Sequence, residues 1–258
     1  MKVFHSLDQI RGMVVNPVVT VGSYDGVHSG HRRILAELER IAAEEGGESV
    51  VVTFDPHPRT VIRNGGKPVC FLNTLDEKIY LLGSAGVNNL LVINFTPGFA
   101  ELSSGEFARQ YLFEGIGAKA LIIGYNHQFG HNREGGMDYL GSLRKEYGFR
   151  LVQIPEVGVE ESKVSSTVVR KLINIGDMET ANKYLCAPYL IMGVPGECGE
   201  IKTNPDKALP PAGEYPAEIR YGTESFPGRL GISHDRRLTL HSQYPGILSG
   251  KEITVFFT

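Results

Sequence analysis

Two histidines, three residues apart, lie in a glycine-rich segment near the start of the chain. The segment reads GSYDGVHSGH over residues 22–31 and places imidazoles at His28 and His31. Its glycines allow the backbone to turn tightly and to approach a ligand closely. A helix expected to begin near His31 turns its free N–H groups and positive dipole end toward the same space. This combination favours a phosphate group as the ligand, with both imidazoles donating hydrogen bonds.

Two other interpretations of the histidine pair are an exposed pair without a ligand and half of a zinc site. The zinc interpretation is weakened because no carboxylate or third histidine follows at a zinc-ligand spacing. The chain contains neither a GxxxxGK[ST] nor a GxGxxG segment, so two other phosphate-binding motifs do not compete. We therefore expect a phosphate site with no resident metal ion.

A second group of polar side chains follows much later, at Ser165, Ser166 and Thr167, with Arg170 one turn further on. Serine and threonine commonly cap helices, and that role alone explains most isolated sequences of this kind. Three hydroxyl groups and a guanidinium at the start of one helix also form a cradle for an anion. Both interpretations remain open when this segment is considered alone.

The elements around these segments alternate between strands and helices. Apolar β-branched runs at 17–22 and 49–54 predict buried strands, with an amphipathic helix between them. Further helices are expected at 75–84, 104–114, 166–175 and 177–185, and further strands at 89–95, 119–124 and 150–155. This order predicts an α/β fold with a Rossmann-like parallel sheet, in which ligands bind beyond the carboxyl ends of the strands.

The composition changes near residue 186, where short strand-like segments and prolines replace the helical pattern. We expect one domain over residues 1–185 and a small all-β, barrel-like domain over residues 186–258. The net charge of −3 argues against a nucleic-acid partner, and no apolar run is long enough to span a membrane. Three scattered cysteines and an N-terminus without a signal peptide favour a cytoplasmic protein. We expect its partners to be small-molecule substrates. The oligomeric state stays open.

Taken together, the motifs resemble those of a known family. GSYDGVHSGH resembles the GxFDGxHxGH signature of nucleotidyltransferases with an HxGH motif, and VSSTVVR at 164–170 resembles their ISSTxxR motif. Within that superfamily the chain is most similar to bacterial FAD synthetases of the bifunctional riboflavin kinase/FMN adenylyltransferase family. The resemblance implies adenylyl transfer from ATP to FMN, with Mg²⁺ as cofactor. It implies catalytic roles for His28, His31 and Arg170, and ATP binding by Gly22, Tyr24, Asp25, Gly30, Ser165, Ser166 and Thr167.

Three further segments carry the resemblance toward the flavin side. TFDPHPR at 53–59 resembles the family's TFxPHPR stretch, and GYNHQFG at 124–130 resembles its GxDFrFG loop. FTPGFA at 95–100 resembles a third run, in which we expect Phe95, Phe99 and Phe107 to pack in the core. The resemblance implies flavin binding by Phe54, His57, Pro58, Arg59, Asn126 and Phe129. Asn126 replaces a frequent aspartate, which leaves a different phosphorylated acceptor open.

The last 70 residues depart from the same family. Thr239 stands where the family's kinase domain has its catalytic glutamate, and threonine is not a base at neutral pH. The family's GxPTAN stretch has only Lys202-Thr203-Asn204 as a remnant. We therefore predict that riboflavin kinase activity is absent. The C-terminal module then remains a structural remnant, a lid over the flavin or an interaction surface, and a non-catalytic flavin or nucleotide sensor is an alternative function for the whole chain.

Overall fold

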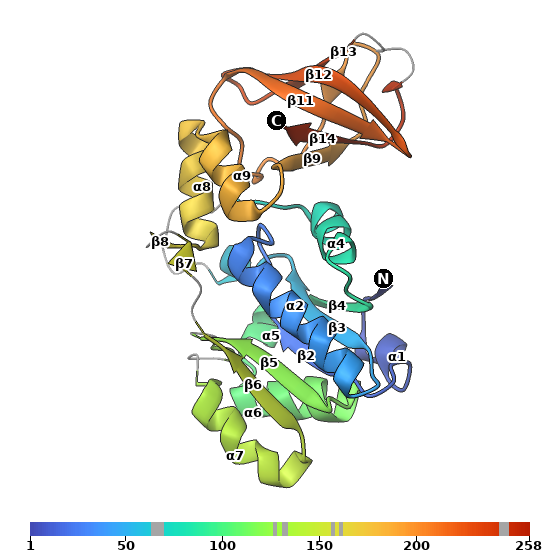
Figure 1. Ribbon diagram of the computed structural model, residues 1–258, viewed down its shortest axis with the longest axis vertical. Coiled ribbons are helices and arrows are strands. Elements are labelled where there is room, and N and C mark those ends of the chain that lie inside the picture. Colours follow the sequence, from blue (N-terminus) through green and yellow to red (C-terminus); the bar gives the residue numbers. More distant parts are fainter. Residues whose placement is uncertain (63–69, 126–127, 131–133, 156–157, 160–161, 243–247) are drawn as a thin grey trace. The chain divides into compact units, whose positions relative to one another are not determined.

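The computed structural model describes residues 1–62, 70–125, 128–130, 134–155, 158–159, 162–242 and 248–258 (Figure 1). The chain folds into two compact units, and each unit draws on separate stretches of the sequence. The first comprises the described parts of Met1–Tyr24, Gly30–Val69 and Ile79–Val157, and the second comprises those of Asp25–Ser29, Cys70–Lys78 and Gly158–Thr258.

The first unit is built on a six-stranded sheet in which every neighbouring pair of strands is parallel. This arrangement confirms the α/β prediction and the five strands expected over this part of the chain, and it adds a short strand at the N-terminal edge. In spatial order the strands are β1 (Lys2–Phe4), β4 (Asn89–Asn94), β3 (Ser49–Asp55), β2 (Val18–Val21), β5 (Ala120–Gly124) and β6 (Arg150–Ile154).

Helices connect these strands, as expected for parallel neighbours. The segment predicted as one helix at 104–114 is a single α-turn followed by a π-helix, and Ser103 with Glu106 forms a capping box at its start. A helix at 137–147 was not expected, because among its residues only Leu140 is buried. The helices before residue 157 are α1 (Leu7–Ile10), α2 (Ser29–Glu44), α3 (Pro58–Val61), α4 (Leu75–Ser84), α5 (Pro97–Ala100), α6 (Ser104–Phe107), the π-helix η1 (Ala108–Ile116) and α7 (Met137–Tyr147).

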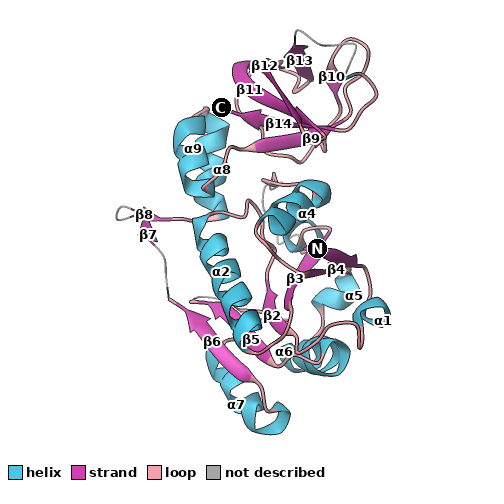
Figure 2. Ribbon diagram, turned by 45° about the vertical axis from the view of Figure 1, so that its right-hand side comes forward, coloured by secondary structure: helices cyan, strands magenta, loops and turns pink. Residues whose placement is uncertain are grey.

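One apolar cluster of the first unit lies on one face of its sheet. Alternate strand residues point to the same face, so Val19, Val21, Val50 and Val52 pack together with side chains of η1. The apolar side of α2 is also buried, and α2 lies along the sheet in both ribbon views (Figure 2). The sheet is therefore covered on both faces, as its continuous apolar strands require.

The second unit contains an antiparallel six-stranded sheet that curls into a barrel-like form. A bridge between Pro195 and Ile201 links the two ends of the sheet, which confirms the expected all-β, barrel-like C-terminal region. In spatial order the strands are β10 (Glu200–Ile201), β13 (Leu238–Ser242), β12 (Glu224–Ile232), β11 (Gly213–Tyr221), β14 (Ile253–Phe257) and β9 (Leu190–Gly193). A two-stranded sheet, β7 (Gly158–Val159) with β8 (Ser162–Lys163), precedes α8 (Ser166–Ile175) and α9 (Met178–Leu185).

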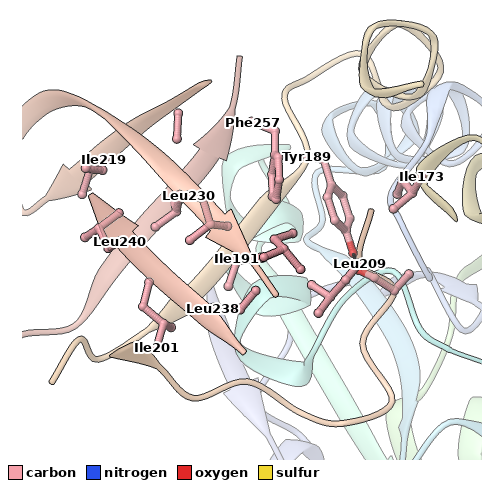
Figure 3. Packing of buried hydrophobic residues seen from close by; sticks show 14 of the residues in the cluster. Ile173, Tyr189, Ile191, Ile201, Leu209, Ile219, Leu230, Leu238, Leu240 and Phe257 are labelled. Atoms are coloured by element: carbon pink, nitrogen blue, oxygen red, sulfur yellow. Dashed lines mark hydrogen bonds between the residues drawn. The ribbon is translucent and has the colours of Figure 1, made fainter. Parts of the chain in front are cut away.

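One apolar cluster joins the barrel to the helices of the second unit. Figure 3 shows Tyr189, Leu209 and Phe257 in this cluster together with Ile173 of α8. Leu72, from the Cys70–Lys78 segment, is fully buried in the same cluster. The division into domains at residue 185 stays a prediction. Among the described residues no helix is long and apolar enough to cross a membrane.

Candidate functional site

The loop after β2 carries the glycine-rich motif and has an unusual backbone. Helix α2 begins at Ser29, two residues earlier than expected, so His28 is the last residue before it. Three loop residues have positive φ angles, namely Tyr24 (47°), Gly26 (93°) and Val27 (42°). A positive φ at a β-branched residue such as Val27 is a true outlier that persists only where its surroundings hold it. Backbone strain of this kind concentrates at ligand sites.

Side chains and backbone of residues 72–73 hold this loop in place. The Asp25 carboxylate accepts hydrogen bonds at Oδ1 from the backbone N–H of Leu72 (2.8 Å) and from that of Asn73 (3.3 Å). The backbone N–H of Gly26 donates in return to Oδ1 of Asn73 (2.8 Å). The sequence motifs gave no sign of this role for Leu72 and Asn73, because both lie outside every motif.

The hydroxyl-rich motif meets the glycine-rich loop inside the second unit. The Ser166 hydroxyl donates a 2.8 Å hydrogen bond to the main-chain carbonyl of Asp25, and Nη2 of Arg170 lies 3.7 Å from Oδ2 of Asp25. Ser165 is the N-cap of α8, since its hydroxyl accepts from the N–H of Val168. Capping and ligand binding are therefore compatible roles for this motif. Residues about 140 positions apart in sequence thus form one local structure.

Burial controls the charges at this junction. Only 3% of the Asp25 side chain is exposed, and this burial raises the pKa of its carboxyl group, opposed first by the nearby Arg170 charge and then by the two backbone N–H groups. The Arg170 side chain is 12% exposed. Asp25 therefore lies beside a cation that is almost withdrawn from water, an environment in which charges interact more strongly than they do in water.

The two histidines differ in their surroundings. His28 is 7% exposed, and burial lowers the pKa of its imidazole to about 4, so it is neutral at pH 7 and donates through one N–H. His31 is the third residue of α2, and its ring lies 5.0 Å from the Tyr24 ring, centroid to centroid. The Tyr24 hydroxyl in turn bonds to the Thr20 hydroxyl at 2.9 Å.

The remaining residues predicted to bind ATP occupy the edges of these segments. The N–H of Gly22 donates to the carbonyl of Val52 (3.0 Å) and so extends the pairing of β2 with β3. Gly30 is the second residue of α2, and Thr167 is exposed on the first turn of α8.

The predicted flavin residues lie in the first unit, apart from one that falls outside the described residues. His57 caps α3 by accepting from the N–H of Arg59 at 3.1 Å, and the Arg59 side chain is exposed. Pro58 is the first residue of that helix. Phe54 and Phe129 belong to a cluster of aromatic rings that also contains Phe95, Phe99 and Phe107. Asn126 lies outside the described residues.

This aromatic cluster is largely a packing feature. Phe95 and Phe107 are 8% and 3% exposed and belong to the core of the first unit, as expected, whereas Phe54 and Phe99 are partly exposed at its border. A half-exposed aromatic border suits a flat ring ligand, which buries an apolar face. The flavin assignment itself stays a prediction.

The described residues around these motifs form no cluster of metal-ligating side chains. In the described part of the chain, no group of three or more histidine, cysteine, aspartate or glutamate side chains is placed to hold a metal ion. Asp25 already accepts two backbone hydrogen bonds at one oxygen and faces Arg170 with the other. These residues fit a Mg²⁺ ion that arrives bound to the phosphates of a nucleotide, which is how Mg²⁺ is commonly held.

The residues singled out in the C-terminal module occupy the barrel. Thr239 lies on β13, opposite Gly231 on one side and Glu200 on the other. Thr203 follows β10, and its hydroxyl oxygen is buried without a hydrogen-bond partner among the described residues. Asn204 accepts at Oδ1 from the N–H of Asp206 and so closes a local turn.

Sequence comparison shows that the chain is similar to FAD synthetases. A family model described as FAD synthetase matches residues 13–168. A bifunctional riboflavin kinase/FMN adenylyltransferase of Listeria monocytogenes is 30% identical over 232 residues, which cover 86% of this chain and 73% of the relative. A second Listeria monocytogenes protein, named FAD synthetase, is 31% identical over 198 residues, covering 77% of this chain and 79% of the relative.

A solved structure supports the fold. The crystal structure of a macrolide-efflux protein from Streptococcus pneumoniae aligns with a TM-score of 0.82, covering 99% of this chain and 88% of that chain. Its sequence is 21% identical, so the likeness concerns the fold alone.

Proposed function

Because the chain belongs to the FAD synthetase family, and with it to the nucleotidyltransferases, we propose that it transfers the adenylyl group of ATP to FMN and lacks riboflavin kinase activity. The observation that carries this proposal is the junction of the two motifs at Asp25. Ser166 donates to the Asp25 carbonyl and Arg170 lies beside the Asp25 carboxylate, which supports an anion site formed by this motif and the loop before α2.

The reaction needs placement and charge stabilisation more than acid–base chemistry. An oxygen of the FMN phosphate attacks the α-phosphorus of ATP, the bond to the bridging oxygen breaks, and pyrophosphate leaves. The attacking phosphate is already ionised, so no strong general base is required. Arg170 and the hydroxyls of Ser165 and Thr167 stabilise the negative charge on the phosphate oxygens.

His28 and His31 contribute as hydrogen-bond donors. Burial keeps His28 neutral, so it donates one hydrogen bond without adding a charge that repels Arg170. Mg²⁺, bound through the phosphates, neutralises part of their charge when it is present.

The absence of kinase activity rests on the C-terminal module. At Thr239, on β13, the side chain offers a hydroxyl where a base is needed to activate the riboflavin hydroxyl. A threonine hydroxyl does not accept that proton at neutral pH, which supports the loss of this second reaction.

One assay tests both parts of the proposal. Purified protein is incubated with ATP and Mg²⁺ and with either FMN or riboflavin, and the flavins are separated by chromatography. FAD formed from FMN supports adenylyl transfer, whereas FMN formed from riboflavin contradicts the loss of kinase activity. Saturable flavin binding without turnover indicates a sensor, and AMP transfer to another phosphorylated compound indicates a different acceptor.

A variant pair tests the phosphate role of the HxGH motif. His31→Ala is expected to lower turnover by about two to three orders of magnitude, the usual cost of removing one donor to a developing negative charge. His5→Ala, an exposed histidine outside the motif, is the matched control and is expected to keep normal turnover. Circular dichroism verifies that both variants are folded. Near-normal turnover in folded His31→Ala contradicts the assignment.

A further inference from the structure

The C-terminal module, residues 186–258, contacts the Cys70–Lys78 segment through buried hydrogen bonds and an ion pair. Nζ of Lys207 lies 2.6 Å from Oε2 of Glu77 and donates to the carbonyl of Leu72 at 2.8 Å. The side chains of Lys207 and Glu77 are both fully withdrawn from solvent. The Tyr189 hydroxyl lies 2.9 Å from the same Leu72 carbonyl and 2.7 Å from that of Ala208, so it shares its proton between them.

Backbone pairing reinforces this contact. The N–H of Phe71 donates to the carbonyl of Asp206, and the N–H of Ala208 donates back to the carbonyl of Phe71, both at 2.6 Å. On β9, the N–H of Met192 donates to Oε1 of Glu77 at 3.1 Å. The segment is therefore fixed in direction as well as position.

Leu72 and Asn73 also contact the glycine-rich loop at residues 22–28, called the phosphate loop below. Leu72 receives Lys207 and Tyr189 at its carbonyl, while its N–H donates to the Asp25 carboxylate at 2.8 Å. Asn73 donates its N–H to the same carboxylate and accepts from the N–H of Gly26. A short chain of contacts therefore leads from the barrel to Asp25 and Gly26, entirely within the second unit.

The buried ion pair of Lys207 and Glu77 is not by itself evidence of added stability. Burial lowers the pKa of Lys207 in spite of Glu77, which reflects the cost of removing its charge from water. Replacing a buried ion pair by well-packed apolar residues is often neutral or stabilising. An apolar pair, however, lacks the fixed hydrogen-bond directions that orient the Leu72 carbonyl, and hence its N–H.

We propose that the C-terminal module is a positioning support for the phosphate loop, with Tyr189 and Lys207 as its positioning residues. They act through Leu72 and Asn73 on Asp25 and Gly26. The consequence for catalysis rests on the proposed function, because it requires that this loop bind ATP. The module is then a working part of the transferase, although it lacks kinase chemistry.

A matched pair of hydroxyl deletions tests the proposal in the full chain. Tyr189→Phe removes the shared hydrogen bond to Leu72 and keeps the ring. Tyr215→Phe removes a hydroxyl of the same module that donates to the Pro211 carbonyl at 2.7 Å rather than to the Leu72 carbonyl. Hydrogen exchange of peptides covering residues 22–30 and 70–78 is measured by mass spectrometry, together with the KM for ATP and for FMN.

We expect Tyr189→Phe to accelerate exchange in both peptides about fivefold, the equilibrium effect of one lost hydrogen bond. The KM for ATP is expected to rise about fivefold while the KM for FMN stays constant, and Tyr215→Phe is expected to change neither. A lower unfolding temperature with unchanged exchange in residues 22–30 and an unchanged KM for ATP overturns the proposal.

A second variant examines the ion pair. Lys207→Met alone leaves the Glu77 charge buried and unpaired, so the double variant Glu77→Gln/Lys207→Met is used to remove both charges. This variant is expected to fold, to exchange faster in residues 22–30 and to raise the KM for ATP about tenfold. Protection of that peptide equal to wild type overturns the role of Lys207.

The two proposals fail separately. If the unaltered chain makes no FAD from FMN, the proposed function is wrong. The exchange of residues 22–30 in Tyr189→Phe and Tyr215→Phe still decides whether the module positions the loop, because that measurement needs no turnover.

Discussion

Replacing Gly26 by alanine probes the close approach of the glycine-rich loop after β2 to Leu72. The φ angle of Gly26 is +93°, and a Cβ atom there lies 2.5 Å from Cδ1 of Leu72, a separation that real Cβ atoms do not show. The positive φ costs alanine about 1–2 kcal/mol. Overpacking a buried site costs about 1–3 kcal/mol more. We expect Gly26→Ala to lower the free energy of unfolding by about 2–5 kcal/mol.

Gly86 provides a control with the same φ angle. Its φ angle is also +93°, but the nearest atom to an added Cβ is Cγ of Glu39 at 3.9 Å, an ordinary contact. Gly86→Ala therefore carries the conformational cost without the overlap. The difference between the two variants, measured by guanidinium unfolding, is expected to be about 1–3 kcal/mol.

Nucleotide binding gives a second measurement of the same change. The alanine displaces either Leu72 or the loop, so we expect the Kd for ATP to rise about tenfold in Gly26→Ala, equivalent to about 1.4 kcal/mol. Gly86→Ala is expected to bind ATP like the unaltered chain. Equal destabilisation by the two variants refutes the close packing of Leu72 against this loop, whereas unchanged ATP affinity in Gly26→Ala contradicts the proposed role of the loop in ATP binding.

Three further predictions concern the junction of the two motifs. Burial lowers the pKa of His28 in the folded state to about 4, so the unfolded chain binds more protons than the folded chain between about pH 4 and 6.5. The contribution of neutral His28 to the free energy of unfolding is therefore complete above pH 6.5, and about 3 kcal/mol of it is lost as the pH falls to 4. His28→Gln is expected to abolish this pH dependence in unfolding experiments. Ser166→Ala removes the hydrogen bond to Asp25 and is expected to cost about 1 kcal/mol in urea unfolding, whereas Thr167→Ala, at an exposed position, is expected to cost less than about 0.5 kcal/mol; equal costs contradict the assigned contact. Arg170→Ala is expected to lower turnover about 10²–10³-fold and to raise the pKa of Asp25 further, and a normal rate in the folded variant refutes its role.

The sequence predicted the framework well where local signals were strong. The strands around Val18–Val21 and Ser49–Asp55 are continuous apolar runs, and α8 begins directly after its Ser165 cap. Such elements are recognisable in the sequence because an apolar run or a helix cap involves residues that are adjacent along the chain. Helix α7 lacked this signal, because its side chains are mostly solvated and its sequence shows no clear apolar stripe.

The site was predictable only as far as its motifs extend. The motifs identified Asp25, Ser166 and Arg170, and the structure shows that these residues touch. Leu72 and Lys207 escaped prediction, because their roles come from contacts with residues far away in the sequence. Leu72 makes these hydrogen bonds through its backbone N–H and carbonyl, so its residue type gives no indication of them.

The hydroxyl of Tyr24 has an implication for how this position can vary. Tyr24 and Thr20 are both buried, and each hydroxyl is the other's partner, while burial raises the pKa of the tyrosine. Tyr24→Phe alone removes the hydrogen-bond partner of the buried Thr20 hydroxyl, and Thr20→Val alone removes that of the buried Tyr24 hydroxyl. Exchanging both together removes the polar pair at little cost. A chain with phenylalanine at this position is therefore free of the demand for a hydroxyl at residue 20, and the two residues are expected to change as a couple.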